Sequence, residues 1–431
     1  MASESVERTD TVVVGAGQAG IAASEHLRAQ SVEHVVLERA RIAERWRSER
    51  WDSLVANGPA WHDRFPNLEF DCGAEIFPDK ESVADYFAAY ARAIDAPVRT
   101  GVDVRLVARL PGRPGFRVET SAGVFEARNV IAATGAFQRP LIPAIAGDVA
   151  TSACEPLQIH SNAYRNPGQL PPGAVLVVGS GSSGVQIADD LLRAGRRVYL
   201  SVGPHDRPPR RYRGRDYVWW LGVLGKWNAD TPGPGTEHVT IAVSGAHGGA
   251  TVEFRALAHR GMTLLGMTTG FANGVARFAP DLAANLQRGD ANYLSVLDEA
   301  DAYIARYGLD LPEEPGARLI PADPACVTTP IRELDLAGAG IGTIIWATGY
   351  GFDYGWLKID SFDDRGRPIH QRGISREPGV YFLGLPWQTR RGSSFIWGVW
   401  HDARFIADQI AISRAYAAYQ PEASTPAVAC P

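Results

Sequence analysis

The 431-residue sequence lacks paired cysteines. Its four cysteines lie far apart, and no two of them form a CxxC motif or another close metal or redox spacing. We therefore expect neither a dithiol redox centre nor a cysteine-based metal site. The thiols are interpreted as scattered, buried or incidental residues: Cys72, Cys154, Cys326 and Cys430.

Long apolar runs are also missing. No stretch of roughly 18 apolar residues occurs, so no transmembrane helix is expected. The first residues, Met-Ala-Ser-Glu-Ser-Val-Glu, are acidic and lack an apolar segment, so no signal peptide is predicted. The net charge of -5 and the pI near 6.1 favour neither nucleic acid nor a membrane surface as partner. The expectation is a cytoplasmic enzyme, with its oligomeric state open, a homodimer included.

A glycine-rich turn near the N-terminus carries the first functional signal. A short β-branched run at 11–14 predicts a buried strand, and GAGQAG and a helical segment follow it. Such glycines allow a tight turn and a close approach of backbone to pyrophosphate, while the helix points its amides at the phosphates. A second strand, 35–37, ends on an acid where ribose hydroxyls would be bound. This pattern predicts a flavin- or NAD-type site containing Gly15, Gly17, Gln18, Ala19, Gly20, Glu38 and Arg39.

A second turn of the same kind follows the apolar run 174–178. It reads GSGSSG and is followed by a helix at 185–192 and a strand at 197–201. Ser201 stands where the first unit has its acid, and arginines come shortly afterwards. Guanidinium groups pair with a ribose 2′-phosphate that an acid would repel, so we predict an NADP-type site, the alternative being an ordinary solvated arginine loop. The predicted residues are Gly179, Gly181, Ser182, Ser183, Gly184, Ser201, Arg207, Arg210 and Arg211.

The remaining pattern predicts an α/β fold with two Rossmann-like dinucleotide-binding domains. Two strands with a following Ala-Thr-Gly, at 129–135 and 342–349, match each other, as two such halves would require. Helices are predicted at 81–94, 296–307 and 401–416. The first domain is expected to be discontinuous, 1–165 and 322–431. The second is expected at 166–321, with an insertion whose tryptophans either line a pocket or pack in the core.

These features together resemble the class B flavin monooxygenases, the flavin-containing and YUCCA-type enzymes and their bacterial relatives. The resemblance spans nearly the whole chain and includes both turns, the segment 45–54 and both Ala-Thr-Gly motifs. The family signature FxGxxxHxxxY is kept only in its second half, His160 to Tyr164, since Cys154 and Pro156 replace its Phe and Gly. Tyr164 stands where Baeyer–Villiger members carry tryptophan, which argues against that branch.

The resemblance implies FAD in the first domain and NADPH in the second. It adds Trp46, Val104, Thr134 and Gly135 to the FAD site, and it places Ala347, Thr348 and Gly349 at the nucleotide edge of the second half. Asn57 resembles the family asparagine that faces a flavin peroxide; the alternative is an Asx turn before Gly-Pro. His160 is interpreted either as catalytic or as a structural histidine at the domain junction.

The implied activity is transfer of one oxygen atom from dioxygen to a small nucleophilic organic substrate, through nitrogen, sulfur or a carbonyl. The missing cysteine pair argues against disulfide reductases, which need such a pair beside the flavin. An FAD-dependent NADPH oxidase or reductase without oxygen insertion is the alternative, and a non-catalytic dinucleotide sensor is a third. The sequence does not name the substrate.

Overall fold

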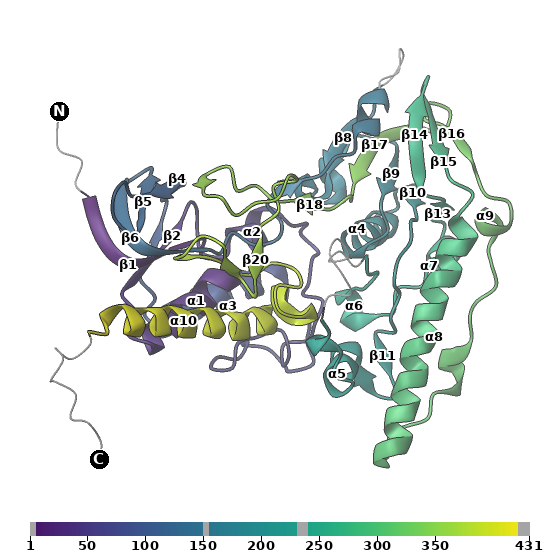
Figure 1. Ribbon diagram of the computed structural model, residues 1–431. Coiled ribbons are helices and arrows are strands. Elements are labelled where there is room, and N and C mark those ends of the chain that lie inside the picture. Colours follow the sequence, from purple (N-terminus) through teal and green to yellow (C-terminus); the bar gives the residue numbers. More distant parts are fainter. Residues whose placement is uncertain (1–5, 150–154, 231–239, 421–431) are drawn as a thin grey trace.

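The computed structural model describes residues 6–149, 155–230 and 240–420, which form two α/β units joined side by side (Figure 1). The first unit contains the beginning and the end of the described chain, and the second is inserted between them. The predicted α/β fold with two Rossmann-like halves is confirmed. Among the described residues, no helix combines the length and the apolar character needed to cross a membrane.

A mixed sheet forms the core of the first unit. Its main strands run in the order β19 (Leu357–Lys358), β4 (Val104–Arg109), β5 (Phe116–Thr120), β6 (Gly123–Ala132), β1 (Val6–Val14), β2 (His34–Glu38) and β3 (Val98–Thr100). β6 also pairs with β22 (Val380–Phe382), which is followed outward by β21 (Ile374–Ser375) and β20 (His370–Gln371). β1, β2, β6 and β22 pair in parallel, so their carboxyl ends meet at one edge.

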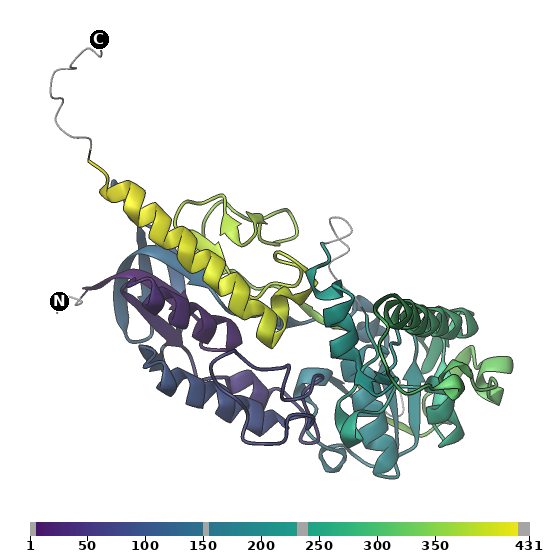
Figure 2. The same ribbon diagram turned by 90° about the horizontal axis from the view of Figure 1, so that it is seen from below.

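Three longer helices cover this sheet: α1 (Gln18–Ala29), α3 (Lys80–Ala93) and α10 (Ile396–Ala418). α1 and α10 lie side by side although they stand at opposite ends of the chain (Figure 2). Buried Ile21 and Leu27 of α1 share one apolar core with Ile406 and Ile410 of α10. The short α2 (Glu44–Ser48) leads away from the glycine turn. The last helix is thus part of the nucleotide-binding half.

The second unit has a parallel sheet of five strands. Their order is β13 (Thr263–Leu265), β10 (Val198–Ser201), β9 (Ala174–Val178), β17 (Ile341–Trp346) and β8 (Leu157–His160). Around it lie α4 (Ser182–Arg193), α5 (Tyr217–Val223), α6 (Ala246–Gly249), α7 (Phe254–His259), α8 (Leu282–Tyr307) and α9 (Ala325–Thr328). A small sheet of β14 (Thr268–Ala272), β15 (Val275–Phe278) and β16 (Glu333–Asp335) and the hairpin of β11 (Arg211–Tyr212) and β12 (Arg215–Asp216) complete it.

The boundary between the units differs from the predicted one at both ends. β8 precedes residue 166 and β17 follows residue 321, yet both pair in the second sheet. The two chain connections run past each other as β7 (Arg139–Pro140) and β18 (Tyr350–Gly351), which pair antiparallel. The second unit therefore extends from β8 to β17, because a strand belongs to the sheet that satisfies its backbone groups.

Two helices begin earlier than predicted. α8 begins at Leu282 rather than near Val296, and its pattern is interrupted by Gly289 and Asp290. A Cβ on Gly289 would lie 2.7 Å from Nε2 of His205, so the glycine permits close packing. α10 begins at Ile396 rather than His401, and its Gly398 packs against the carbonyl group of Gly392. In both helices, close packing requires a glycine that periodicity alone does not explain.

Candidate functional site

The first glycine turn lies between β1 and α1 and has room for a phosphate. Gly15 has a φ of +104°, and a Cβ there would lie 2.8 Å from the carbonyl oxygen of Ala133. A Cβ on Gly20 would overlap the carbonyl oxygen of Gly15, which fixes the close helix–strand packing. A Cβ on Gly17, in contrast, would meet no atom within 4 Å. The one glycine without a protein neighbour is the one where pyrophosphate is expected to approach, so this turn fits FAD.

Glu38 ends β2 beside this turn. Its carboxylate accepts hydrogen bonds from the backbone N–H of Ala16 at 2.9 Å and of Ala40 at 3.0 Å. Its carbonyl oxygen accepts one from the N–H of Val102 at 2.9 Å, which brings the chain just before Val104 to the same edge. The acid and the turn thus form one continuous surface. Arg39 is exposed and lies 4.0 Å from Glu49.

Other predicted FAD residues lie around the same edge. Gln18 donates from Nε2 to the carbonyl oxygen of Ser394 at 2.8 Å, joining the turn to the loop before α10. Ala19 is buried on α1. Thr134 and Gly135 follow β6, and both accept hydrogen bonds from the Gln138 side chain. Trp46, on α2, packs against the apolar cores of both units, and so it lies at their junction.

The second turn, between β9 and α4, repeats the first. Gly179 has a φ of +109°, and a Cβ there would lie 2.5 Å from the carbonyl oxygen of Ala347. A Cβ on Gly184 would overlap the carbonyl oxygen of Gly179. Gly181 differs from its counterpart, since its Cβ would lie 3.5 Å from a methyl carbon of Thr240. The backbone fits a second dinucleotide, and its surroundings are more crowded.

The segment that crowds this turn is 240–243. The hydroxyl of Ser182 donates to the carbonyl oxygen of Ile241 at 2.8 Å, and the next residue, Ser183, is half-buried. The N–H of Asp206 donates to the carbonyl oxygen of Thr240 at 2.8 Å. The segment is therefore tied both to the start of α4 and to the arginine loop.

Three residues predicted to contact NADPH, Ser201, Arg207 and Arg210, have different surroundings from those expected. Ser201 is 2% exposed, and its hydroxyl donates to the carbonyl oxygen of Gly266 and accepts from Thr268. Arg207 forms a buried ion pair with Asp290 at 2.6 Å.

Arg210 is 1% exposed and binds both carboxylate oxygens of Asp216. The structure does not support phosphate binding by Ser201, Arg207 or Arg210, because internal partners already occupy them. Neither buried guanidinium fits the alternative of a solvated loop. Arg211 is exposed, lies over the ring of Phe77 and is the arginine of this set that solvent can reach.

The Ala347–Thr348–Gly349 segment follows β17 as Thr134–Gly135 follows β6. The carbonyl oxygen of Gly349 accepts from Nε2 of His160 at 3.0 Å, and Nδ1 of His160 contacts the side-chain oxygen of Asn162 at 3.1 Å. His160 is 4% exposed, and burial lowers its pKa. Both ring nitrogens have partners within the fold, which favours the structural interpretation of this histidine.

Asn57 lies in the loop between α2 and α3, at the junction of the units. Its side-chain oxygen accepts from Nε2 of Gln186 at 2.9 Å, and its carbonyl oxygen accepts from Nη1 of Arg210 at 2.5 Å. An Asx turn would need a backbone N–H two residues on, and Pro59 has none. The Asx alternative is therefore excluded, and the contact with Gln186 is one that no sequence signal indicated.

Aromatic side chains from both units meet beside this loop. Trp227 stacks on His62 with a centroid separation of 5.3 Å, and it lies edge-on to Trp397 at 5.3 Å. Trp220, in contrast, is fully buried with Tyr212 against α8. Of the tryptophans in the predicted insertion, Trp227 thus makes a contact between the units, and Trp220 belongs to the core.

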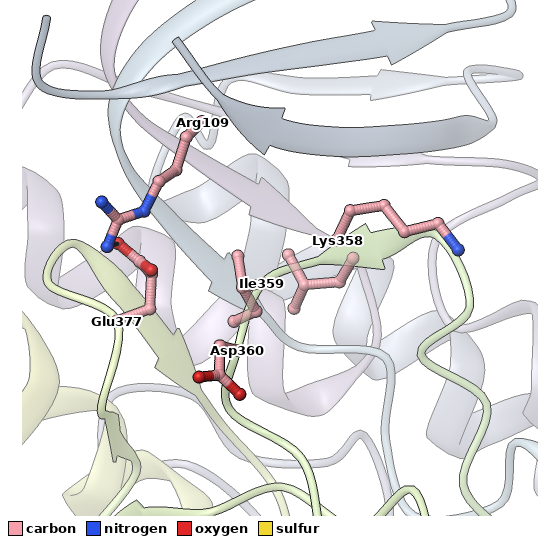
Figure 3. A pocket seen from close by; sticks show the side chains of 6 residues that line it. Arg109, Lys358, Ile359, Asp360 and Glu377 are labelled. Atoms are coloured by element: carbon pink, nitrogen blue, oxygen red, sulfur yellow. Dashed lines mark ion pairs between the residues drawn. The ribbon is translucent and has the colours of Figure 1, made fainter. Parts of the chain in front are cut away.

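A surface hollow of about 560 Å³ lies elsewhere on the first unit (Figure 3). It is lined by β4, β19 and the turn before β22, and the carboxylate of Glu377 pairs with Arg109 at one side. None of the predicted site residues lines it. Of the cysteines, Cys72 is exposed and Cys326 is half-buried, while Cys154 and Cys430 lie outside the described residues.

Comparisons with known proteins agree with this geometry. Residues 12–215 match the family model described as pyridine nucleotide-disulphide oxidoreductase. The chain is similar to an uncharacterized CzcO-like oxidoreductase of Geobacillus kaustophilus, with 31% identity over 93% of this chain and 98% of the relative. It is similar to indole-3-pyruvate monooxygenase YUCCA1 of Oryza sativa subsp. japonica, with 34% identity over 44% of this chain and 47% of that protein.

The fold is also similar to that of a flavin-containing monooxygenase from Stenotrophomonas maltophilia. The TM-score is 0.65 at 19% identity, covering 96% of this chain and all of the other. Fold and paired turns define an FAD-dependent oxidoreductase of the flavin monooxygenase type, which also uses a pyridine nucleotide. Within this class, the chain belongs to the family of CzcO-like oxidoreductases.

Proposed function

We propose that the protein is an NADPH-dependent monooxygenase that transfers one oxygen atom from dioxygen to a small nucleophilic organic substrate. The observation that carries the proposal is the position of Asn57. This side chain belongs to the FAD-type unit, yet it is held by Gln186 on the helix of the second glycine turn. A polar amide at the junction of the two dinucleotide-type units is where both cofactors would come together.

The first unit would hold FAD through the turn Gly15–Gly20 and through Glu38. The second would hold NADPH through the turn Gly179–Gly184, with Arg211 as the accessible cation for a 2′-phosphate. Bound FAD supplies hydride acceptance and dioxygen chemistry, and the protein supplies orientation and a dry environment. Asn57 would donate an amide N–H to a bound oxygen atom without offering an acidic proton.

The substrate would be an amine, a sulfide or a carbonyl compound such as a 2-oxo acid or an aldehyde. The aromatic contact around Trp227 and Trp397 favours an organic substrate with apolar surface. The second unit extends from β8 to β17, so its segment between β10 and β17 would shape the choice among these classes.

The test uses the purified holoenzyme with NADPH and isotopically labelled dioxygen. A panel of one amine, one sulfide, one 2-oxo acid and one aldehyde is offered, and both labelled product and hydrogen peroxide are measured. We expect one labelled oxygen atom in the product of at least one class. Stoichiometric peroxide with every class would overturn oxygen insertion and favour the oxidase or reductase. Purification without any flavin would overturn both and favour a dinucleotide sensor.

A substitution tests the role of Asn57 without a known substrate. Asn57→Ala should leave anaerobic flavin reduction by NADPH unchanged and raise the rate at which reduced enzyme releases peroxide in air. Asn57→Asp keeps an oxygen acceptor for Gln186 and removes the donor, so it should behave like the alanine variant. Unchanged peroxide release in both variants would remove Asn57 from the site.

A further inference from the structure

Gln186 makes a contact between the units whose effect on the direction of the Asn57 amide the proposed activity leaves open. It lies on α4, two residues after Gly184, and faces the loop of the first unit. Its Nε2 donates to the side-chain oxygen of Asn57 at 2.9 Å and to the carbonyl oxygen of Val243 at 2.7 Å. Both protons of this amide nitrogen therefore have acceptors.

The carbonyl oxygen of Val243 determines the direction of both amides. A backbone carbonyl can only accept, so the Gln186 atom that faces it must be the nitrogen. That nitrogen is also the atom nearest the Asn57 side chain, so Asn57 must present its oxygen there. The two N–H groups of Asn57 are consequently directed away from Gln186.

The backbone of this loop is held from the second unit as well. Nη1 of Arg210 donates to the carbonyl oxygen of Asn57 at 2.5 Å, and the Asp216 carboxylate fixes that guanidinium. A Cβ on Gly245 would overlap the carbonyl oxygen of Ala56, so the segment after Val243 packs directly on the loop. Asn57 is exposed, and with its backbone fixed the hydrogen bond from Gln186 is what sets the direction of its side-chain amide.

We propose that Gln186 is a positioning residue that orients the Asn57 amide with its donors toward the reaction site. The inference rests on the proposed function of Asn57. It assigns to α4 a second task beside nucleotide binding: the helix that would carry the NADPH turn also orients the group that acts on oxygen.

The decisive variant is Gln186→Glu. A carboxylate accepts only, so it repels the oxygens of both Val243 and Asn57 and favours the flipped amide, with Nδ2 toward residue 186. We expect peroxide release in air without substrate to rise about fivefold, the change implied by one lost hydrogen bond. Anaerobic flavin reduction should stay unchanged. Lowering the pH should reduce the excess release in this variant alone, since a protonated carboxyl can donate again.

Matched variants separate orientation from simple loosening. Gln186→Ala leaves the Asn57 amide free to take either direction, so its peroxide release should lie between that of the wild type and that of Gln186→Glu. Arg193→Ala removes a polar contact of the same helix, the surface pair with Asp189, and should match the wild type. Hydrogen exchange of residues 54–60 in the holoenzyme should rise in Gln186→Ala and not in Arg193→Ala.

A double variant distinguishes this inference from the proposed function. In Asn57→Ala, the further change Gln186→Glu should add nothing, because no amide is left to orient. Additive effects would overturn the positioning role. An effect of Asn57→Ala without any effect of Gln186→Glu would also overturn it and leave the proposed function intact. If Asn57→Ala itself has no effect, the proposed role of Asn57 fails first.

Discussion

The two glycine turns share one backbone and differ in what surrounds it. In each, the first glycine has a positive φ and the third packs on the first. The space at Gly17 is open, and the acid that ends the neighbouring strand, Glu38, is bound by backbone N–H groups of the turn and the next loop. In the second unit, Gly181 faces Thr240, and the Ser201 hydroxyl is bonded to Gly266 and Thr268. The shared part is what any pyrophosphate requires, and the part that differs is what would distinguish one dinucleotide from another.

Of the substitutions that test this comparison, the one with the largest expected effect lies in the arginine loop of the second unit. Arg210→Ala removes one partner of a buried ion pair and leaves the Asp216 carboxylate unpaired. We expect a loss of about 3–5 kcal/mol in unfolding free energy, measured by chemical denaturation. Arg210→Met/Asp216→Leu, which removes both charges, should recover much of the loss. If the Arg210→Ala variant is stable and only its KM for NADPH is raised, Arg210 contacts the nucleotide and the ion-pair interpretation is wrong.

The third glycines give a matched pair of substitutions. Gly20→Ala and Gly184→Ala each place a Cβ on a carbonyl oxygen, at a cost of about 1–3 kcal/mol for overpacking. The first should lose bound FAD, measured from the flavin absorbance per chain. The second should keep FAD and lose its reduction by NADPH. If both variants lose the same cofactor, the assignment of the two units is wrong.

A smaller effect is expected at Arg211, where a substitution tests whether the second unit prefers NADPH to NADH. Arg211→Ala should raise the KM for NADPH about tenfold and hardly change that for NADH, because one charged contact to a 2′-phosphate is lost. Arg215→Ala removes a neighbouring exposed cation that lies over Trp219 and serves as the control. Equal changes for both nucleotides in Arg211→Ala would contradict a 2′-phosphate contact.

Lowering the pH should reduce the stability of both units by similar amounts, which are smaller than the effects described above. Burial lowers the pKa of His26 and His34 in the first unit and of His160 and His205 in the second. The unfolded chain binds protons near pH 6.5 and the folded chain binds them only at lower pH, so stability falls as pH drops through about 6.5. Melting temperatures from pH 8 to 5.5 test this. His160→Asn should flatten the dependence; a melting temperature constant with pH would contradict it.

Local patterns predicted the strand, turn and helix of both glycine-rich segments. The strand, turn and helix of each fingerprint are close in sequence, and the burial of Val12–Val14 and of β9 follows from their apolar runs. The partner of Arg207 is 83 residues away, and pairing of that kind leaves no local pattern. In the sequence, exposed Arg211 and buried Arg207 cannot be distinguished, because only the fold shows which of them pairs with a carboxylate.

The predicted boundary between the two units differs from the observed strand pairing for a related reason. β8 is a four-residue strand of mixed polarity, and nothing in its residues indicates which of two sheets accepts it. β17 carries the Ala-Thr-Gly match to the other half, but the predicted boundary did not follow that match. The Asx turn at Asn57 could have been excluded from the sequence, since Pro59 lacks the needed N–H. The contact with Gln186 could not, because it joins residues 129 positions apart.

The packing of α10 on α1 has a consequence for how the protein is made. The roughly 260 residues between Ala132 and Ile396 take about 13 to 50 seconds to synthesise at common translation rates. Throughout that time the apolar face of α1 that α10 will cover has no partner from its own unit. The inserted unit can complete its sheet earlier, once β17 leaves the ribosome. The half that begins first on the ribosome is therefore the half that is finished last.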